Sequence, residues 1–364
     1  MIGPKVNMLQ TPSLANITNS QQVVFFPTFG HLDEDGQTWN IAIRGSVFEP
    51  DLLDYRRRLL VRVLRRLLDL RESELNSDIF KQRVGAFLTS GEAGKRIVIR
   101  VGSQTYHLKK KSNRNGHFSG KLRLSAEEAG FLELSGQLND GWLQFDTTTT
   151  GSNAPNRFFG KAQLISETGI SVISDIDDTI KHTNVLRRRS LLTNTFLRKF
   201  QPIPGISELY RSWAEQGAAF HYVSSSPWQL YQAIADHCHE EGLPEGTFHL
   251  RSIRFRDPSI FRLFVARRWR KRRVIMSIFR TFPSRSFLLV GDSGEKDPEI
   301  YGAIARKFPH QVKKIYIRQL KNQSFNPLRY GKAFRHLPRD SWKIFQDPGE
   351  IPQSLSFLGV SEGA

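Results

Sequence analysis

A ten-residue stretch, ISVISDIDDT at residues 170–179, constrains this chain more than any other. A short apolar, β-branched run ends there in three carboxylates, Asp175, Asp177 and Asp178. The run predicts a buried parallel strand, and open α/β sheets bind ligands just past the carboxyl ends of such strands. Crowded carboxylates repel one another unless they bind a cation or face water. The stretch therefore indicates either a site for a hard divalent cation or a solvated acidic turn.

From about residue 163 the chain alternates between strand-like and helix-like segments, which is typical of an α/β fold with a Rossmann-like, doubly wound parallel sheet. The expected strands of this unit, residues 163–320, are 170–174, 218–223, 287–290 and 315–317. Residues 321–364 form a C-terminal extension that is interrupted by prolines. Its Trp342, Ile344 and Phe345 indicate that part of the extension packs back on the sheet.

Residues 21–160 have a two-residue periodicity and turn dipeptides such as Asn115-Gly116, which predict a mainly antiparallel β-sandwich or partial barrel. No catalytic group of residues is recognisable in this unit. The polar segment 147–157 is the expected linker to the second unit. The expected strands are 23–27, 39–45, 97–101, 104–108, 119–124, 131–138 and 142–146.

A basic amphipathic helix is expected at residues 51–71, inside the first unit. Two interpretations are open: a helix that lies on an anionic membrane, or a helix that packs on its own domain with its arginines in water. Its apolar positions recur at helical spacing, with arginines in the gaps; they are Leu52, Tyr55, Leu59, Val63 and Leu67.

Charge and composition restrict the partners. The chain has 53 Lys and Arg against 35 Asp and Glu, a net charge of +18, which favours an anionic partner such as nucleic acid, a membrane surface or a phosphorylated substrate. The single cysteine, Cys238, has no intramolecular disulfide partner, which fits a reducing compartment. Residues 1–20 lack a signal-peptide pattern, and no run approaches the roughly 18 apolar residues of a membrane span. We therefore expect a cytoplasmic protein that is either free in solution or peripheral at a membrane.

A second motif, FHYVSSSPWQ at residues 220–229, ends the neighbouring expected strand. The hydroxyl of Ser224 is placed to bind a phosphoryl oxygen, and Ser225 follows it. Ser226 begins a capping-box pattern with Pro227 at the first helical position, so we expect Ser226 to cap a helix.

Two further motifs complete the set. The run RRWRKRR at residues 267–273 offers one lysine, Lys271, whose charge would offset the carboxylates and a transferred phosphoryl group. The strand-like run 287–290 ends in Gly291-Asp292, and Asp292 would complete an oxygen shell for a cation. Asp297 precedes a proline and is expected to cap the next helix.

Together these motifs resemble the haloacid dehalogenase superfamily of phosphotransferases. The flanking residues narrow the resemblance to the phosphatidate phosphatases of the actin-patch-protein type. The similar segments are 174–181, 222–228 and 291–301, with Lys271 in the context K-x-x-x-I-x-x-I-F-x-x-F-P. The resemblance extends from the mid-160s to about Arg318, and Lys271 departs from it in lying among arginines.

The resemblance implies a Mg²⁺-dependent hydrolysis of phosphatidate, or of another phospholipid monoester, to diacylglycerol and phosphate. It assigns Asp175 as nucleophile, Asp177 as general acid and base, and Lys271 as the residue that steadies the intermediate. It implies substrate contacts from Thr179, Ser224 and Ser225. It implies Mg²⁺ ligation by Asp175, Asp292 and the backbone carbonyl of Asp177, with Asp297 as a further candidate.

Two other functions stay open at this point. One is a phosphatase of nucleic-acid ends or phosphoproteins, and the other is a non-catalytic basic module that binds lipid. The segment 180–203 is too short for a large cap domain, so the site should be open to a large substrate; it carries basic and apolar residues that suit either a lipid interface or a short lid. The triplet His237-Cys238-His239 is expected to be structural, because adjacent helical residues diverge by about 100°.

Overall fold

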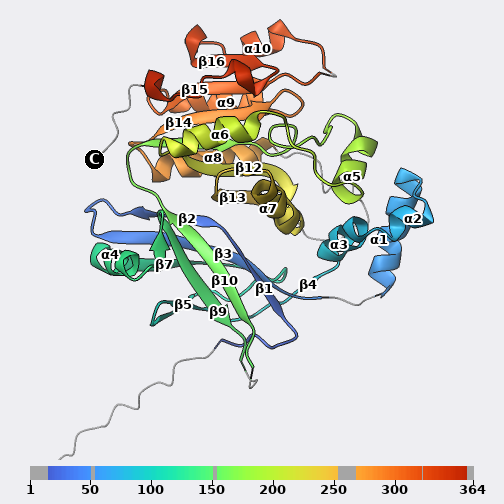
Figure 1. The fold of residues 1–364 in the computed structure, drawn as a ribbon, viewed down its shortest axis with the longest axis vertical. Helices are drawn as coiled ribbons and strands as arrows, with labels where there is room; N and C mark the ends of the chain where they lie inside the picture. Colours follow the sequence, from blue (N-terminus) through green and yellow to red (C-terminus); the bar gives the residue numbers. More distant parts are fainter. Residues whose placement is uncertain (1–14, 51–53, 151–153, 253–267, 322, 359–364) are drawn as a thin grey trace, which may run out of the picture.

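The computed structural model describes residues 15–50, 54–150, 154–252, 268–321 and 323–358. It is a mixed α/β structure with two sheets (Figure 1). The first sheet has ten strands and is mainly antiparallel, and the second has six strands that are all parallel. The first sheet ends with Leu164 and the second begins with Ile170.

The parallel sheet has the spatial order β13-β12-β11-β14-β15-β16. Its strands are β11 (Ile170–Ser174), β12 (Ala219–Pro227), β13 (Gly246–Arg251), β14 (Ser286–Asp292), β15 (Val312–Arg318) and β16 (Trp342–Phe345). Numbered from β11, this order is 3-2-1-4-5-6, and the chain reverses its direction of winding between β11 and β14. Ligands of doubly wound sheets bind at this point, outside the carboxyl ends of the strands.

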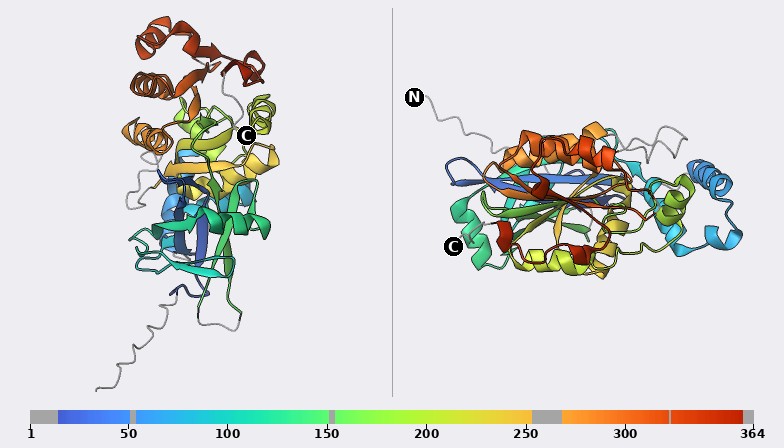
Figure 2. Two further views of the ribbon diagram at one scale, coloured as in Figure 1. Left: turned by 90° about the vertical axis from the view of Figure 1, so that its left-hand side faces the viewer. Right: turned by 90° about the horizontal axis from the view of Figure 1, so that it is seen from above.

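Helices cover both faces of this sheet (Figure 2). On one face lie α6 (Ile206–Glu215) and α7 (Tyr231–Glu240), and on the other lie α8 (Arg268–Thr281), α9 (Asp297–Lys307) and α10 (Pro327–Ala333). All five residues of β11 are buried, because it lies in the middle of the sheet between the two layers. The expected α/β structure with a parallel sheet is therefore confirmed, and β16 confirms that part of the C-terminal extension packs back on this sheet.

The first sheet contains β1 (Gln22–Phe26), β2 (Thr28–Leu32), β3 (Thr38–Glu49), β4 (Ser90–Gly91), β5 (Val98–Val101), β6 (Gln104–His107), β7 (His117–Ser125), β8 (Leu138–Asn139), β9 (Trp142–Thr148) and β10 (Arg157–Leu164). Its pairs are antiparallel except β2 with β10. The closure of this sheet into a sandwich or partial barrel stays a prediction.

Two expectations for this unit are wrong. The first half of the strand expected at 131–138 is instead the end of helix α4 (Ala126–Leu134), because Ser125 and Glu128 form a reciprocal capping box that begins a helix. The linker expected at 147–157 instead lies within the first sheet, because β9 ends at Thr148, β10 begins at Arg157, and the two strands pair antiparallel with Arg157 opposite Thr148. Polar composition indicated a linker, but threonines are also good strand residues.

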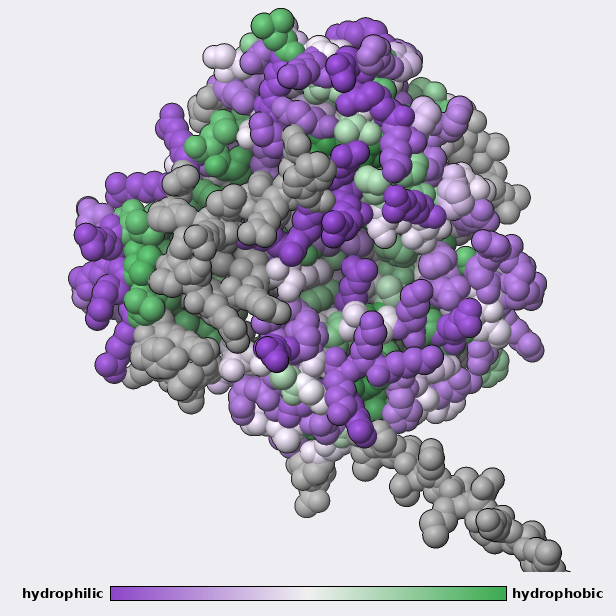
Figure 3. Space-filling view, turned by 180° about the vertical axis from the view of Figure 1, so that it is seen from behind, coloured by the Kyte–Doolittle hydropathy of each residue, from purple (hydrophilic) through white to green (hydrophobic). Residues whose placement is uncertain are grey.

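The basic helix exists as α1 (Asp54–Leu68), followed by α2 (Glu72–Leu75) and α3 (Asp78–Phe87). Leu52 lies outside the described residues. Among the side chains of α1 that the structure describes, the buried ones are Leu60, Leu64 and Leu68. They lie one position from the expected stripe, and Leu59 is 46% exposed. The helix therefore packs within the molecule, and its described arginines are exposed. Seen from behind, the described surface is mostly hydrophilic, with a strip of apolar side chains at the side where α1 and α2 lie (Figure 3).

Helices α1 and α3 contact the segment that follows the acidic motif. That segment contains α5 (Arg188–Phe196), which lies beside α3 and α1 (Figure 1). Arg83 of α3 donates to the backbone carbonyls of Asn194 at 3.2 Å and Thr195 at 2.5 Å. The rings of Phe87 and Phe196 are 5.3 Å apart. The short segment is therefore packed against the first unit rather than on the parallel sheet alone.

The His237-Cys238-His239 triplet lies on α7, as expected for a structural element. His237 and Cys238 are buried, whereas His239 is exposed, so the three side chains do not face one point. Across the described helices, none has the length and apolar character that a membrane crossing requires.

Buried histidines give the fold an acid sensitivity. Burial lowers the pKa of His221 to about 3, and its Nδ1 lies 2.8 Å from the hydroxyl of Thr247. Because the unfolded pKa is about 6.5, protons bind the unfolded chain preferentially below that pH, and stability is lost as pH falls. We expect this residue to lower the free energy of unfolding by about 2 kcal/mol when the pH falls from 7 to 5.

Urea unfolding of the wild type and of His221→Gln, at both pH values, checks this expectation. The variant lacks the titrating group. The free energy of unfolding of the wild type minus that of the variant should therefore be about 2 kcal/mol smaller at pH 5 than at pH 7. A difference between the two proteins that is the same at both pH values would contradict it. Buried carboxyl groups with raised pKa values stabilise the fold as pH falls, which opposes the effect of His221. Both proteins contain these groups, so the comparison cancels their contribution.

Candidate active site

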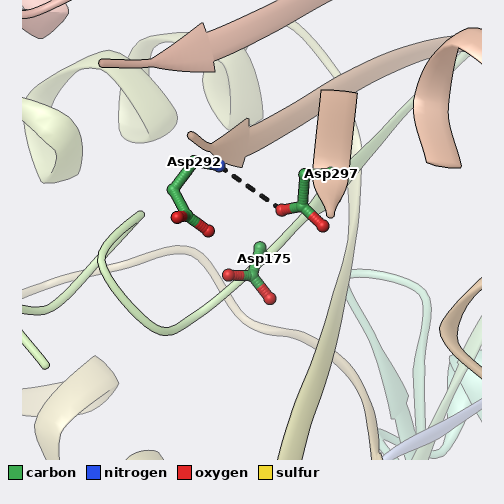
Figure 4. Close-up of side chains that lie close together, drawn as sticks. All are labelled: Asp175, Asp292 and Asp297. Carbon is green, nitrogen blue, oxygen red and sulfur yellow. Dashed lines mark hydrogen bonds between the residues drawn. The ribbon is translucent and has the colours of Figure 1, made fainter. Parts of the chain in front are cut away.

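Three carboxylates meet at the carboxyl ends of the central strands. Asp175 directly follows β11, Asp292 ends β14, and Asp297 begins α9. One oxygen from each lies within 4.8 Å of one from each of the others, and all three residues are buried (Figure 4). The backbone N–H of Asp175 donates to the carbonyl of Val290 at 2.9 Å, which fixes the two strand ends beside each other. The sheet topology thus brings together residues that are more than one hundred positions apart.

Lys271 reaches this cluster from α8 and is 5% exposed. Its Nζ lies 2.7 Å from Oδ1 of Asp175 and 2.5 Å from Oδ1 of Asp297. Burial alone would lower the pKa of Lys271, but the charges of Asp175 and Asp297 raise it well above its ordinary value. Lys271 is therefore held as a cation between two acids.

The single positive charge of Lys271 does not neutralise the three carboxylates of the cluster. Oδ2 of Asp175 and Oδ2 of Asp292 are both buried and have no hydrogen-bond partner in the described structure. Burial raises the pKa of each of these carboxyls, and Asp297 raises both further. Unpartnered, mutually repelling carboxylate oxygens are the ligands that a hard divalent cation prefers.

Asp297 is not the helix cap that its sequence indicated. The N-cap of α9 is Lys296, and no side chain caps this helix. Besides accepting from Lys271, the carboxylate of Asp297 accepts the backbone N–H of Asp292 at 3.3 Å. Both of its oxygens thus have partners, so Asp175 and Asp292 offer the freer ligands.

Asp177 lies beside this cluster in a different environment. Oδ1 accepts from Nζ of Lys181 at 2.6 Å and from the hydroxyl of Thr183 at 2.8 Å. Oδ2 accepts from the hydroxyls of Ser224 at 2.9 Å and Ser226 at 2.7 Å. Burial would raise the pKa of Asp177, but the charge of Lys181 and these hydrogen bonds outweigh it and lower the pKa. Asp177 is therefore ionised, and any ligation of a metal would use its backbone carbonyl.

The three serines of the second motif make contacts that differ from the expected ones. Ser226 is part of β12 and caps no helix; its hydroxyl donates to Asp177. The helix-start pattern is misleading here, because the strand continues to Pro227 and a short 3₁₀ turn follows. Ser224 bonds Asp177 and accepts the backbone N–H of Ser226, whereas the hydroxyl of Ser225 lies 3.5 Å from Oε2 of Glu295.

Asp178 and Thr179 shape the turn after β11. Asp178 has a φ of 55°, and its carboxylate accepts the backbone N–H groups of Thr183, Asn184 and Val185 at 2.8 to 2.9 Å. The turn is thereby tied to the segment that leads to α5. The hydroxyl of Thr179 is buried and has no hydrogen-bond partner in the described structure.

Lys181 is a site residue that the sequence motifs did not reveal. It is 3% exposed, and besides Asp177 it contacts the ring of Phe200, with Nζ 4.4 Å from the ring centroid. The guanidinium of Arg83 lies 3.8 Å from the centroid of the same ring. The signal was present, since a lysine follows Asp177 by four positions, but nothing in the sequence showed that it turns inward.

Glu295 is a second site residue that the motifs did not reveal. Burial and the charges of Asp297 and Asp177 raise the pKa of its carboxyl, and the charge of Lys271 lowers it. The result is a pKa of about 7. Its backbone N–H donates to Oδ1 of Asp292 at 3.0 Å, as does that of Gly294. The loop after β14 thus adds a fourth acid to the surroundings of Asp175.

Comparisons with known proteins agree with this location. Residues 170–319 match the family described as the catalytic domain of phosphatidate phosphatase APP1. Phosphatidate phosphatase APP1 of Saccharomyces cerevisiae is 36% identical over 185 residues, which are 50% of this chain and 31% of that protein. An uncharacterised protein of Schizosaccharomyces pombe is 31% identical over 177 residues, or 48% of this chain and 29% of that one. The chain thus spans about a third of the length of these relatives.

Similarity to solved structures is weak. A β-glucuronidase of Parabacteroides merdae aligns with a TM-score of 0.27 and 9% identity, over 83% of this chain and 34% of that one. A β-glucuronidase of Bacteroides uniformis aligns with a TM-score of 0.25 and 12% identity, over 82% and 33%. Similarity at this level says nothing about the fold or the function of this chain.

Proposed function

We propose that the protein hydrolyses phosphatidate to diacylglycerol and phosphate, because residues 170–319 match the family of phosphatidate phosphatase APP1 catalytic domains. The observation that carries the proposal is the cluster of Asp175, Asp292 and Asp297 around Lys271 at the switch point of the parallel sheet. The proposal also assigns a haloacid dehalogenase-like fold to the parallel-sheet unit, in agreement with its strand order.

The proposed reaction has two steps. A carboxylate oxygen of Asp175 forms a bond to phosphorus, the bond between phosphorus and the ester oxygen breaks, and diacylglycerol leaves after that oxygen takes up a proton. Water then attacks the phosphorus of the aspartyl-phosphate, which releases phosphate and restores the carboxylate. Lys271 supports this role, because it orients Asp175 and offsets negative charge that develops on the phosphoryl oxygens.

Asp177 is the proposed proton carrier in both steps. As an ionised group it suits the second step, in which a base accepts a proton from water. For the first step it needs to hold a proton and to give up some of its four donors. Ser224 and Ser226 are placed to change partners, since a phosphoryl oxygen could accept the hydroxyls that now serve Asp177.

We propose Mg²⁺ as the cofactor. The two unpartnered buried oxygens, one on Asp175 and one on Asp292, fit its preference for oxygen ligands, and the backbone carbonyl of Asp177 is a further proposed ligand. Asp297 would support the ion through the groups it already contacts. When bound, such an ion supplies positive charge near the reacting phosphate.

The positive charge of the chain supports two further proposals, one on its location and one on an alternative substrate. The net charge of +18 and the exposed arginines of α1 support a peripheral association with anionic membranes from the cytoplasm, worth about 1 kcal/mol per basic residue near the surface. The same charge supports, less specifically, a phosphatase of nucleic-acid ends. A non-catalytic lipid-binding module does not require the buried lysine among the acids.

A phosphate-release panel with and without Mg²⁺ tests these proposals. We expect phosphatidate vesicles to be the best substrate against lysophosphatidate, diacylglycerol pyrophosphate, oligonucleotide ends and small phosphate esters. Chelation should abolish release, and added Mg²⁺ should raise the melting temperature by relieving repulsion among the acids. Preference for oligonucleotide ends would favour the alternative function, and full activity in chelator would rule out the cofactor.

A further inference from the structure

A cavity of about 990 Å³ lies between the first sheet, helix α3 and residues 228–232 at the beginning of α7. Its position is an interface between the two units, where pockets for small molecules commonly occur, and its volume is in the range of such pockets. We propose that this pocket binds an acyl chain of the phospholipid whose phosphate enters the candidate active site. This inference rests on the proposed function.

The walls of the pocket are suited to an acyl chain. Several apolar side chains that line it are only half-buried, so an apolar occupant would remove their remaining surface from water. They come from both units and are Val24, Phe48, Val61, Leu75, Trp228 and Tyr231. Phe26 stacks on Trp228, with ring centroids 3.7 Å apart, and closes the space between the two units.

The charges around the pocket favour an anionic lipid. Among its described lining residues the charged side chains are Arg58, Lys81 and Arg114, and none is Asp or Glu. All three are exposed, so they lie at the mouth rather than in the apolar interior. Basic residues around an apolar pocket are complementary to a phospholipid in an anionic membrane, whereas a neutral apolar ligand would not require them.

The pocket begins close to the reacting groups. Trp228 follows Ser226 by two positions, so their Cα atoms are within about 7 Å of each other. Ser226 donates to Asp177, and the opposite wall, α3, contacts α5 through Arg83. A phosphatidate carries its phosphate on one end carbon of glycerol and its acyl chains on the other two carbons, so one chain is on the carbon next to the phosphate-bearing one. One molecule can therefore place its phosphate at Asp175 and a chain against Trp228.

Gly85 offers a way to fill the pocket without disturbing the fold. It lies on α3 in the lining, and a Cβ added there meets no atom within 4 Å. The variant Gly85→Trp therefore projects its ring into open space. Gly130 on α4 is the matched control, since it is also helical, exposed and open around its Cβ, but does not line the pocket.

The readout is the ratio of kcat/KM for dioleoyl phosphatidate to that for p-nitrophenyl phosphate. Gly85→Trp should lower this ratio at least roughly tenfold, the cost of leaving about two methylene groups unburied, and Gly130→Trp should leave it unchanged. Equal ratios in the two variants would overturn the proposal. Because the ratio compares two substrates of one protein, a partial loss of folded protein cancels.

A binding measurement separates this inference from the proposed function. Phosphatidate with a pyrene-labelled acyl chain is titrated into Asp175→Asn, with and without Gly85→Trp or Gly130→Trp. Weaker binding only with Gly85→Trp supports the pocket, and equal binding in all three proteins overturns it. If the wild type hydrolyses no phosphatidate, the proposed function fails, while this titration still decides whether the pocket takes the chain.

Discussion

Asp175→Asn should abolish phosphate release from phosphatidate, with a loss on the order of 10⁴-fold or more in kcat, because the amide cannot form the aspartyl-phosphate. The variant should fold. Lys271 keeps its contact with Asp297, and the substitution removes one of several crowded carboxylates whose pKa values burial has raised. Phosphate release and the free energy of unfolding in urea are the two measurements.

A chemical trap makes this experiment specific. When wild-type protein is quenched in acid during turnover, phosphate should stay covalently attached, and hydroxylamine should release it as expected for an acyl phosphate. Asp175→Asn should trap none. The matched control is Asp236→Asn on α7, an exposed site where Gln232 donates to the side chain and an amide oxygen can accept equally well. Turnover that persists in Asp175→Asn would show that another group is the nucleophile.

Lys181→Met should lower both activity and stability. It leaves Asp177 buried and ionised without its cation, a change that costs about 3–5 kcal/mol in buried pairs. The rate should fall on the order of 10²-fold, because the proton carrier loses its orientation. Urea unfolding and phosphate release from p-nitrophenyl phosphate measure the two effects. Lys199→Met is the control, since that lysine is exposed and its pair with Glu240 is screened by water and should contribute little to stability.

A double variant tests why stability is lost. Lys181→Met with Asp177→Asn removes both charges, so it should regain most of the stability that Lys181→Met loses and none of the activity. If the double variant is as unstable as the sum of the two single variants, the two side chains do not interact as the structure indicates. Recovery of activity in the double variant would remove Asp177 from the proposed mechanism.

The parallel-sheet unit is predictable from sequence because its signals are local and agree with one another. Apolar runs that end in polar residues predict that Asp175, Ser224 and Asp292 lie at one edge of the sheet, and the strand order agrees. The rule that parallel strands meet with their carboxyl ends together then brings these residues into one site. Lys271 is identified by the need for a positive charge, although the six other residues of its run are basic or aromatic.

The errors arise where one local pattern has two structural outcomes. The pattern Ser-Pro at Ser226 begins helices, but here a strand extends through it, and the serine bonds Asp177. The Asp-Pro pattern at Asp297 does open a helix, yet its carboxylate contacts Lys271 because the helix begins beside the cluster. Lys181 could not be assigned from sequence, because only the packing of Phe200 and Arg83 shows that it is buried.

The contact between α3 and α5 has a consequence for protein engineering. A fragment that started near residue 165 would contain every matched position of the family but would lose Arg83, Leu64 and Phe87. The faces of Leu192 and Phe196 would then be exposed to solvent, and Phe200 would lose one of its two cations. Minimal versions of this protein should therefore keep residues 54–88 in trans or in a circularly permuted gene, rather than be trimmed to the region of sequence similarity.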